Sequence, residues 1–453
     1  MPAGDGETVS REGALAALVR GRTKKSLLGG VPGGDPLITL GAKRGATIHI
    51  FVSLPPPGAQ RNNRRYPVVI IGGGYHGILE SPSTRIPGLV SIADIAPTAV
   101  ALAEGTEPGI GWTPGTAADL RELNSTLRRQ HRARDPAVAI LSFAALLFAV
   151  VALGLGSVPM ARAGLLAAPL ALAAAIALSG VGVTRTSMLL PVLAALTVAV
   201  SVVGGVLLGR RALAACFIAL IAAYLVVLVA KPTWPALAAI GPNPGQGSRF
   251  YGCTNLTTSI VLTVTLFAGA VFGRRSLVPI ALLSLVTVGW SKAGADGGGL
   301  IVLAAACTAL GLRLAAGRLT VRAVAVAGAV AVALGFAFVG LDAATGGHSH
   351  VTKRVGEGPG ALLDELGNRL HISAEVIAST WHAALVFAIA MVSLVLLARS
   401  RPRFAAGDAL LVGIAVSLLV NDTPQHVAAA GAISYGVLWV LERVRRAEPR
   451  PGG

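Results

Sequence analysis

The sequence predicts an all-α polytopic membrane bundle of about eleven transmembrane helices, preceded by a small, truncated α/β domain. The first reason is composition: the chain of 453 residues is 54% hydrophobic and 13% charged, with a mean hydropathy of +0.71, which is too apolar for an ordinary soluble protein. The second is that apolar runs about 18 to 23 residues long recur after residue 136, and such runs can cross a bilayer. The third is that the preceding residues are mixed and loop-rich.

These observations divide the chain into three parts. We expect residues 1–136 to form the partial α/β domain, residues 137–446 to form the helical domain, and residues 447–453 to form a disordered tail. The lipid bilayer is therefore the first partner that the sequence predicts.

Charge and cysteine content argue against two classes of function. The formal net charge is +17, but most arginines flank the apolar runs and no basic-aromatic pattern accompanies them, so a nucleic-acid partner is not expected. The cysteines Cys216, Cys253 and Cys307 are far apart, and two of them lie inside apolar runs. They indicate neither a disulfide framework nor a zinc site.

The amino-terminal domain contains two candidate strands and one candidate helix. Residues 47–54 (TIHIFVSL) alternate and are β-branched, and residues 66–71 (YPVVII) form a second apolar run that glycines end. Asp94 can cap a helix whose first turn accepts Pro97 and which ends near Gly105. The chain opens without a signal peptide, and we therefore expect the domain to lack its beginning.

The motifs around this helix resemble a known superfamily. A glycine-rich turn with Gly77 is followed by STR at 83–85, PGLV at 87–90 and DIAPT at 94–98. Over residues 48–105, this order resembles the carboxy-terminal end of the alkaline phosphatase and sulfatase superfamily. The resemblance implies a hydrolase-like α/β domain outside the cytoplasm.

The same resemblance implies that the catalytic part of such a domain is missing. Members of the superfamily have an upstream Asp, a Ser or Thr nucleophile and Asp-His pairs that hold two metal ions, and too few residues precede the match to supply them. We expect no cofactor in this chain; a divalent metal such as zinc would need a complete domain.

His76 is a weak metal candidate, because a lone histidine near a strand is more often structural. An incomplete domain and a non-catalytic remnant both fit, and we favour the first.

Eleven candidate spans follow the domain, some of them short enough to require neighbours in a bundle. They are residues 137–157, 164–183, 187–209, 212–230, 256–272, 276–290, 298–316, 322–342, 381–398, 408–420 and 426–441. The connections on one side of these spans carry most of the arginines. The positive-inside rule therefore predicts a cytoplasmic carboxy terminus and an extracytoplasmic amino-terminal domain in the cell membrane. The arginine cluster at 128–134 lies on the predicted outer side, which is contrary to the positive-inside rule. We attribute this exception to a missing upstream anchor.

Four polar connections fall on the predicted outer side. The first, residues 241–255 (GPNPGQGSRFYGCTN), is the most unusual, because its glycines allow the backbone to fold back between two apolar runs. Arg249 offers a planar fork of donors for phosphate or carboxylate, and Tyr251 and Asn255 can orient a headgroup or sugar. The simpler interpretation is a re-entrant loop whose arginine reaches the interface.

The second connection contains Lys292 and Asp296, which would share one face if the segment were helical and would then form a simple ion pair. Otherwise Asp296 is a candidate catalytic base or cation ligand, since an ionisable group at the membrane edge is costly. The third connection contributes His350, which a solvated or headgroup-facing loop explains better than a metal site. The fourth contains Asn421 and Asp422, which a bare turn explains equally well.

Together these residues predict an outer cavity that binds an anionic substrate. The set is Arg249, Tyr251, Asn255, Lys292, Asp296, His350, Asn421 and Asp422. Its order also resembles a group of bacterial polytopic proteins in which a phosphatase-like extracytoplasmic domain is fused to such a membrane half. The dipeptides at 253–254 and 423–424 depart from that pattern.

The sequence therefore favours a bacterial envelope protein that binds or acts on a phosphorylated or lipid-linked anionic envelope substrate at its extracytoplasmic face. A transporter or flippase of such a precursor is the alternative, although no inverted repeat is visible. Whether the chain is an enzyme, and its oligomeric state, stay open.

Overall fold

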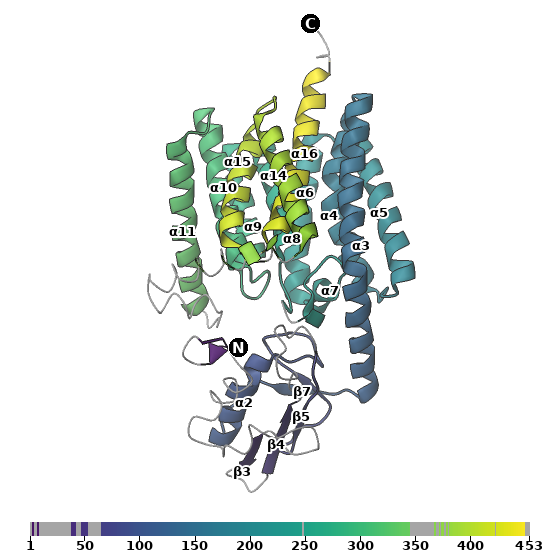
Figure 1. Cartoon of the computed structure of the whole chain (residues 1–453), viewed down its shortest axis with the longest axis vertical. Helices are drawn as coiled ribbons and strands as arrows, with labels where there is room; N and C mark the ends of the chain where they lie inside the picture. The colour runs from purple at the N-terminus through teal and green to yellow at the C-terminus, as the bar shows by residue number, and fades with distance from the viewer. Residues whose placement is uncertain are drawn as a thin grey trace. The chain divides into compact units, whose positions relative to one another are not determined.

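The computed structural model of the chain contains two compact units, which Figure 1 draws in the colours of the sequence. The first comprises Met1–His131 with Asn243–Tyr251, and the second comprises Arg132–Pro242 with Gly252–Gly453. A short segment from the middle of the chain thus belongs to the amino-terminal unit. The structure describes residues 2–3, 7–8, 38–41, 47–52, 65–246, 249–344, 367, 371, 373–375, 377–378, 380–421 and 423–448.

The amino-terminal unit is built on a three-stranded antiparallel sheet of order β3-β4-β5. Both expected strands form, as β4 and β5, and Ile50 pairs with Ile70 between them. The strands of the unit are β1 (Pro2–Ala3), β2 (Glu7–Thr8), β3 (Ile38–Gly41), β4 (Thr47–Val52), β5 (Val68–Ile71), β6 (Ile78–Glu80) and β7 (Gly111–Thr113). Ile48 and Ile50 of β4 and Ile70 of β5 are buried in one cluster with Ile95 and Ala99. The helix that carries Ile95 and Ala99 therefore covers one face of the sheet.

That helix, α2 (Ile92–Glu104), has a different cap from the one expected. Ser91 is the N-cap, and its side chain accepts a hydrogen bond from the N–H of Ala93. The carboxylate of Asp94 is engaged elsewhere, because it accepts hydrogen bonds from Ser81 at 2.5 Å and Ser83 at 2.6 Å. The helix ends at Gly105 in the left-handed conformation, as expected.

The second unit is a bundle of long apolar helices, in which α11 lies at one edge and α5 at the other (Figure 1). Its first helix, α3, begins within the amino-terminal unit. The helices are α3 (Ala117–Leu155), α4 (Val158–Gly180), α5 (Thr186–Leu207), α6 (Arg210–Ala230), α7 (Thr233–Ala236), α8 (Asn255–Phe272), α9 (Arg274–Gly289), α10 (Gly297–Ala316), α11 (Val321–Ala344), α14 (Trp381–Arg399), α15 (Ala405–Val420) and α16 (Pro424–Ala447).

The bundle identifies the chain as a multi-pass membrane protein, but the expected count of eleven spans is not confirmed. Each expected span overlaps a helix, and among the described residues eight helices are long and apolar enough to cross a membrane. Helices α9 and α15 have 16 residues each, so each rises about 24 Å, less than the about 30 Å of hydrocarbon. The apolar stretch of α11, Val321–Gly335, is also short.

Small residues allow the helices of the bundle to approach closely. Ala161, Ala163 and Ala167 of α4 are fully buried, and α4 packs along α5. At Gly205 of α5, an added Cβ would lie 2.9 Å from the backbone nitrogen of Ala163. Contact of this kind replaces a hydrophobic driving force between helices in lipid, because lipid tails are as apolar as the side chains.

We therefore expect Gly205→Ala to destabilise the helical unit by about 1–3 kcal/mol, because α4 and α5 would have to separate. Thermal unfolding of the purified full-length protein in detergent measures the change. Gly328→Ala in α11 is the matched control, since a Cβ at this position would meet nothing within 4 Å. Equal melting temperatures for the two variants would contradict the close approach of α4 and α5.

Candidate functional site

The polar loop 241–255 is divided between the two units. Its central part, Asn243–Tyr251, belongs to the amino-terminal unit. There Nη1 of Arg65 donates to the carbonyl oxygen of Gly245 at 2.8 Å. The amide nitrogen of Asn243 lies 3.1 Å from Nδ1 of His131. The loop is therefore an integral part of this unit and not only a link between two helices.

Two of the predicted binding residues, Arg249 and Tyr251, lie in this central part, and both are half-buried. The guanidinium of Arg85 lies over the ring of Tyr251, with 3.9 Å from its central carbon to the ring centroid. This is a cation-π contact, in which the negative face of the ring attracts the cation. The unit thus brings Arg85, from the STR motif, to the loop that carries Arg249.

Arg65 also belongs to this unit, and its guanidinium donates hydrogen bonds to two different residues. Besides Gly245, it contacts Asn124, whose side-chain oxygen accepts from Nη2 at 2.6 Å and from Nε at 3.1 Å. Burial, and secondarily the positive charge of Arg128, lowers the pKa of Arg65. Sequence reasoning missed Arg65 and Arg85, because neither is close to the loop along the chain.

The last part of the loop, from Gly252, belongs to the helical unit and packs on the connection between α9 and α10. The N–H of Cys253 donates to the carbonyl oxygen of Gly294 at 2.7 Å. Gly252 has a φ of 85°, and a Cβ there would collide with the same carbonyl group, so this position requires glycine. Two of the four predicted connections therefore meet.

Asp296 is the buried acid of this region, with 3% of its surface exposed. Its Oδ2 accepts a hydrogen bond from the hydroxyl of Thr258, in the first turn of α8, at 2.8 Å. Its backbone N–H donates to the carbonyl oxygen of Val288 at 2.9 Å, which folds the connection back onto the end of α9. Asp296 is thus fixed at the start of α10 through both backbone and side chain.

Lys292 and Asp296 are four residues apart, but the segment that joins them is not helical. Residues 291–294 form a turn and not a helix, and Lys292 is exposed whereas Asp296 is buried.

Asn255 and Asn421 lie at the same end of the bundle. Nδ2 of Asn255, the first residue of α8, donates to the hydroxyl of Thr423 at 2.6 Å, and Thr423 caps α16. Asn421 caps α15, is buried, and donates to the hydroxyl of Ser417 at 2.6 Å. His350 and Asp422 lie outside the described residues.

We call this group the polar end. It consists of Asn255, Thr258, Asp296, Ser417, Asn421 and Thr423, at the adjoining ends of α8, α10, α15 and α16. Three of its members were not predicted. Thr258 follows Asn255 by three residues and Ser417 precedes Asn421 by four, so helical spacing from the predicted residues could have identified both.

An apolar cavity of about 230 Å³ lies in the half of the bundle that leads to the polar end. It is lined by the second halves of α4 and α6 and by the first half of α8, with Tyr224 and Trp234 among its residues. The hydroxyl of Tyr224 lies 3.7 Å from Sγ of Cys253, in the segment that enters α8. Sequence reasoning also missed this cavity; only the two aromatic residues near span ends hinted at it.

His76 packs against an aromatic ring in the amino-terminal unit. Its ring centroid lies 3.4 Å from that of Trp112, and its Nδ1 lies 3.0 Å from the carbonyl oxygen of Gly74. Among the residues that the structure describes, no group of three or more His, Cys, Asp or Glu side chains could hold a metal ion.

Comparison with models of protein families, with curated proteins and with solved structures finds no match to this chain. The candidate site therefore depends on its own geometry.

The bond from Thr258 to Asp296 provides a test of the polar end. Thr258→Val keeps the shape of the side chain but removes a donor from a buried carboxylate, so we expect a loss of about 1–3 kcal/mol in the free energy of unfolding. Denaturant titration of the full-length protein in detergent measures the loss.

Thr263→Val is the control for this variant. Thr263 lies on the same helix and is also buried, but its hydroxyl donates only to the carbonyl oxygen of Ser259, one turn earlier. A clearly smaller loss is expected, because that carbonyl keeps its helical environment. If both variants lost the same free energy of unfolding, the bond from Thr258 to Asp296 would contribute no more stability than the bond from Thr263 to its own helix.

Proposed function

We propose that this chain is an envelope membrane protein that binds a phosphorylated, lipid-linked substrate at the polar end and acts on it there. The polar end is proposed to face the extracytoplasmic side. The proposal retains the resemblance of residues 48–105 to the end of a phosphatase and sulfatase domain as a hypothesis about the chemistry.

One observation carries the proposal: the apolar cavity and the polar end lie in the same half of one bundle. A lipid-linked substrate has an apolar chain and a polar head, and it needs adjoining regions of both kinds. The cavity of about 230 Å³ is smaller than the about 300–1,000 Å³ of sites that enclose a drug-sized ligand. It suits a segment of acyl or isoprenoid chain that enters sideways from the lipid.

The amino-terminal unit supports the anionic part of the proposal. Its loop segment carries Arg249, and Arg85 lies against Tyr251 in the same segment. Arginine forks are suited to phosphate oxygens, because two parallel N–H groups can bind one phosphate. Within the amino-terminal unit, we assign a phosphate-binding role to Arg249 and Arg85.

Asp296 is the candidate for a chemical role in this site. A carboxylate that is 3% exposed at the membrane edge costs free energy unless the protein compensates it, and Thr258 provides part of the compensation. Such a group can accept a proton from a substrate hydroxyl or hold a cation that accompanies a phosphate. We propose the role of base or cation ligand for Asp296.

A transporter or flippase is the second candidate, and the burial of Asp296 among α8 and α10 is the observation that favours it. Intramembrane acids commonly mark ion or substrate pathways. Reconstitution of the full-length protein in liposomes with a fluorescent diacyl phosphatidic acid distinguishes the two candidates. A transporter moves the probe between leaflets faster than protein-free liposomes do, whereas a protein that only binds its substrate does not.

Occupation of the apolar cavity by a lipid chain can be tested by filling it. We expect Ala223→Trp, which places an indole in the cavity wall, to reduce labelling by a phosphatidic acid with a photoreactive acyl chain about tenfold, equivalent to about 1.4 kcal/mol. Ala219→Trp is the control, because Ala219 is an equally exposed alanine of α6 outside the cavity lining. Equal labelling of the two variants would exclude the cavity as the chain site.

The role of Arg249 is tested with the same phosphatidic acid probe in nanodiscs of neutral lipid. Arg249→Ala removes a fork of donors, and we expect the apparent Kd to rise about tenfold or more. Arg121→Ala removes the same charge from an exposed position in the same unit and should leave the Kd unchanged. Asp296→Ala should abolish any turnover without a comparable rise in Kd. Unchanged binding by Arg249→Ala would remove Arg249 from the site.

The proposed orientation predicts which residues a membrane-impermeant thiol reagent reaches in intact cells. Glu107→Cys in the amino-terminal unit should be labelled at once, whereas Arg318→Cys, between α10 and α11, should be labelled only after permeabilisation. Both positions are exposed, and a Cys216→Ser background limits labelling of the partly exposed native thiol. The opposite pattern would reverse the proposed topology.

A further inference from the structure

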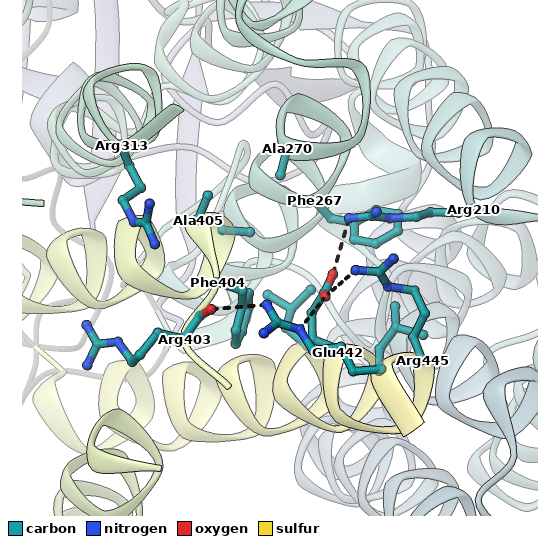
Figure 2. Close-up of a pocket in the computed structure, with 13 residues that line it drawn as sticks. Arg210, Phe267, Ala270, Arg313, Arg403, Phe404, Ala405, Glu442 and Arg445 are labelled. Carbon is teal, nitrogen blue, oxygen red and sulfur yellow. Dashed lines mark hydrogen bonds and ion pairs between the residues drawn. The ribbon is translucent and has the colours of Figure 1, made fainter. Parts of the chain in front are cut away.

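A second cavity lies at the other end of the bundle from the polar end. It measures about 240 Å³ and lies between the first residues of α6 and α15 and the last turns of α8, α10 and α16 (Figure 2). Its apolar wall contains Phe267 and Leu438. Its charged lining consists of Arg210, Arg313, Arg403, Glu442, Arg445 and Arg446.

Two buried carboxylates hold these arginines in place. Glu442 lies 3.2 Å from Arg210 and 2.8 Å from Arg445, and Figure 2 shows these guanidinium groups meeting at its carboxylate. Asp408, which is 5% exposed, lies 2.8 Å from Nε of Arg313 and 2.5 Å from Arg403. The arginines come from α6, α10, α16 and the segment before α15, so only the folded bundle assembles them.

Positive charge and hydrogen-bond donors are in excess in this cavity. Five arginines face two carboxylates, which leaves a net charge of +3. The five guanidinium groups carry about five N–H donors each, and together these exceed the roughly four acceptor sites on each of the two carboxylates. Nε of Arg210 is buried and has no hydrogen-bond partner in the described part of the chain. A buried donor without a partner is costly, and it indicates a ligand with acceptor oxygens.

Membrane topology alone does not explain this arrangement. Arginines that only set orientation need to lie near the ends of spans, as Arg274 and Arg275 do at the exposed start of α9. The cavity arginines instead converge, and Arg210 is the first residue of α6, where the positive end of the helix dipole disfavours a cation. Convergence at a mutual electrostatic cost points to an anion that is bound between them.

We propose that this cavity binds a phosphate-bearing anion, as a lipid headgroup or as free phosphate. A phosphate offers several acceptor oxygens and up to two negative charges, which matches converging forks better than a single carboxylate does. The volume of about 240 Å³ admits a headgroup but not a whole lipid. The apolar wall and the position at the span ends suit a basic pocket between helices that receives an anionic headgroup. This site is independent of the polar end.

The test compares ligand-induced stabilisation of the full-length protein in neutral detergent. The two probes are inorganic phosphate and dioctanoyl phosphatidylglycerol, each titrated against the melting temperature, because a ligand that binds only the folded state raises it. We expect at least one probe to stabilise the wild type, and Arg210→Gln with Arg445→Gln to weaken the apparent affinity about tenfold or more. A response to phosphatidylglycerol alone would identify a lipid headgroup as the ligand, and a response to both would identify phosphate itself.

Arg274→Gln with Arg275→Gln is the matched control, since it removes the same charge at the same end of the bundle outside the cavity. It should retain wild-type affinity. If the cavity double variant does not fold, Arg446→Gln replaces it, because Arg446 is half-exposed and lies 3.9 Å from Glu442. The proposal is overturned if neither probe stabilises the wild type, or if the folded cavity variant binds as tightly as the control.

Discussion

The interior of a bilayer offers no hydrogen-bond partner, and this constraint determines where polar groups lie in the helical unit. Within the helices, several hydroxyl groups bond to the preceding turn. Thr197 donates to the carbonyl oxygen of Leu193 at 2.7 Å, and Thr265 donates to that of Val261 while it also meets Ser284. Side chains that cannot be satisfied in this way gather at the ends of the bundle, where chain turns and neighbouring helices supply partners. Both candidate sites follow from this separation.

The two ends of the bundle satisfy their charges differently. At the polar end the buried acid Asp296 accepts a hydrogen bond from the hydroxyl of Thr258, and its backbone N–H donates to the carbonyl oxygen of Val288. At the other end Glu442 and Asp408 each hold more than one arginine, so positive charge exceeds negative charge. This excess of positive charge is the basis of the anion site that we propose for that end.

The shared loop connects the amino-terminal unit to the proposed function. Because Asn243–Tyr251 belongs to that unit, a segment between two membrane helices contributes Arg249 and Tyr251 to it. Such sharing makes the unit depend on the membrane half for part of its own structure.

The sequence by itself determined the class of protein, the position of the helices and two strands of the amino-terminal sheet, because hydropathy and β-branched alternation are local properties. It did not determine how many helices span the membrane, since helix length depends on where turns and packing end each helix. Only the tertiary structure decided which polar residues meet: Thr258 and Asp296 are 38 residues apart, and Asn255 and Thr423 are 168 apart. The arginines of the second cavity show the same limit. Their local positions explain topology, but their convergence is a property of the packed bundle alone.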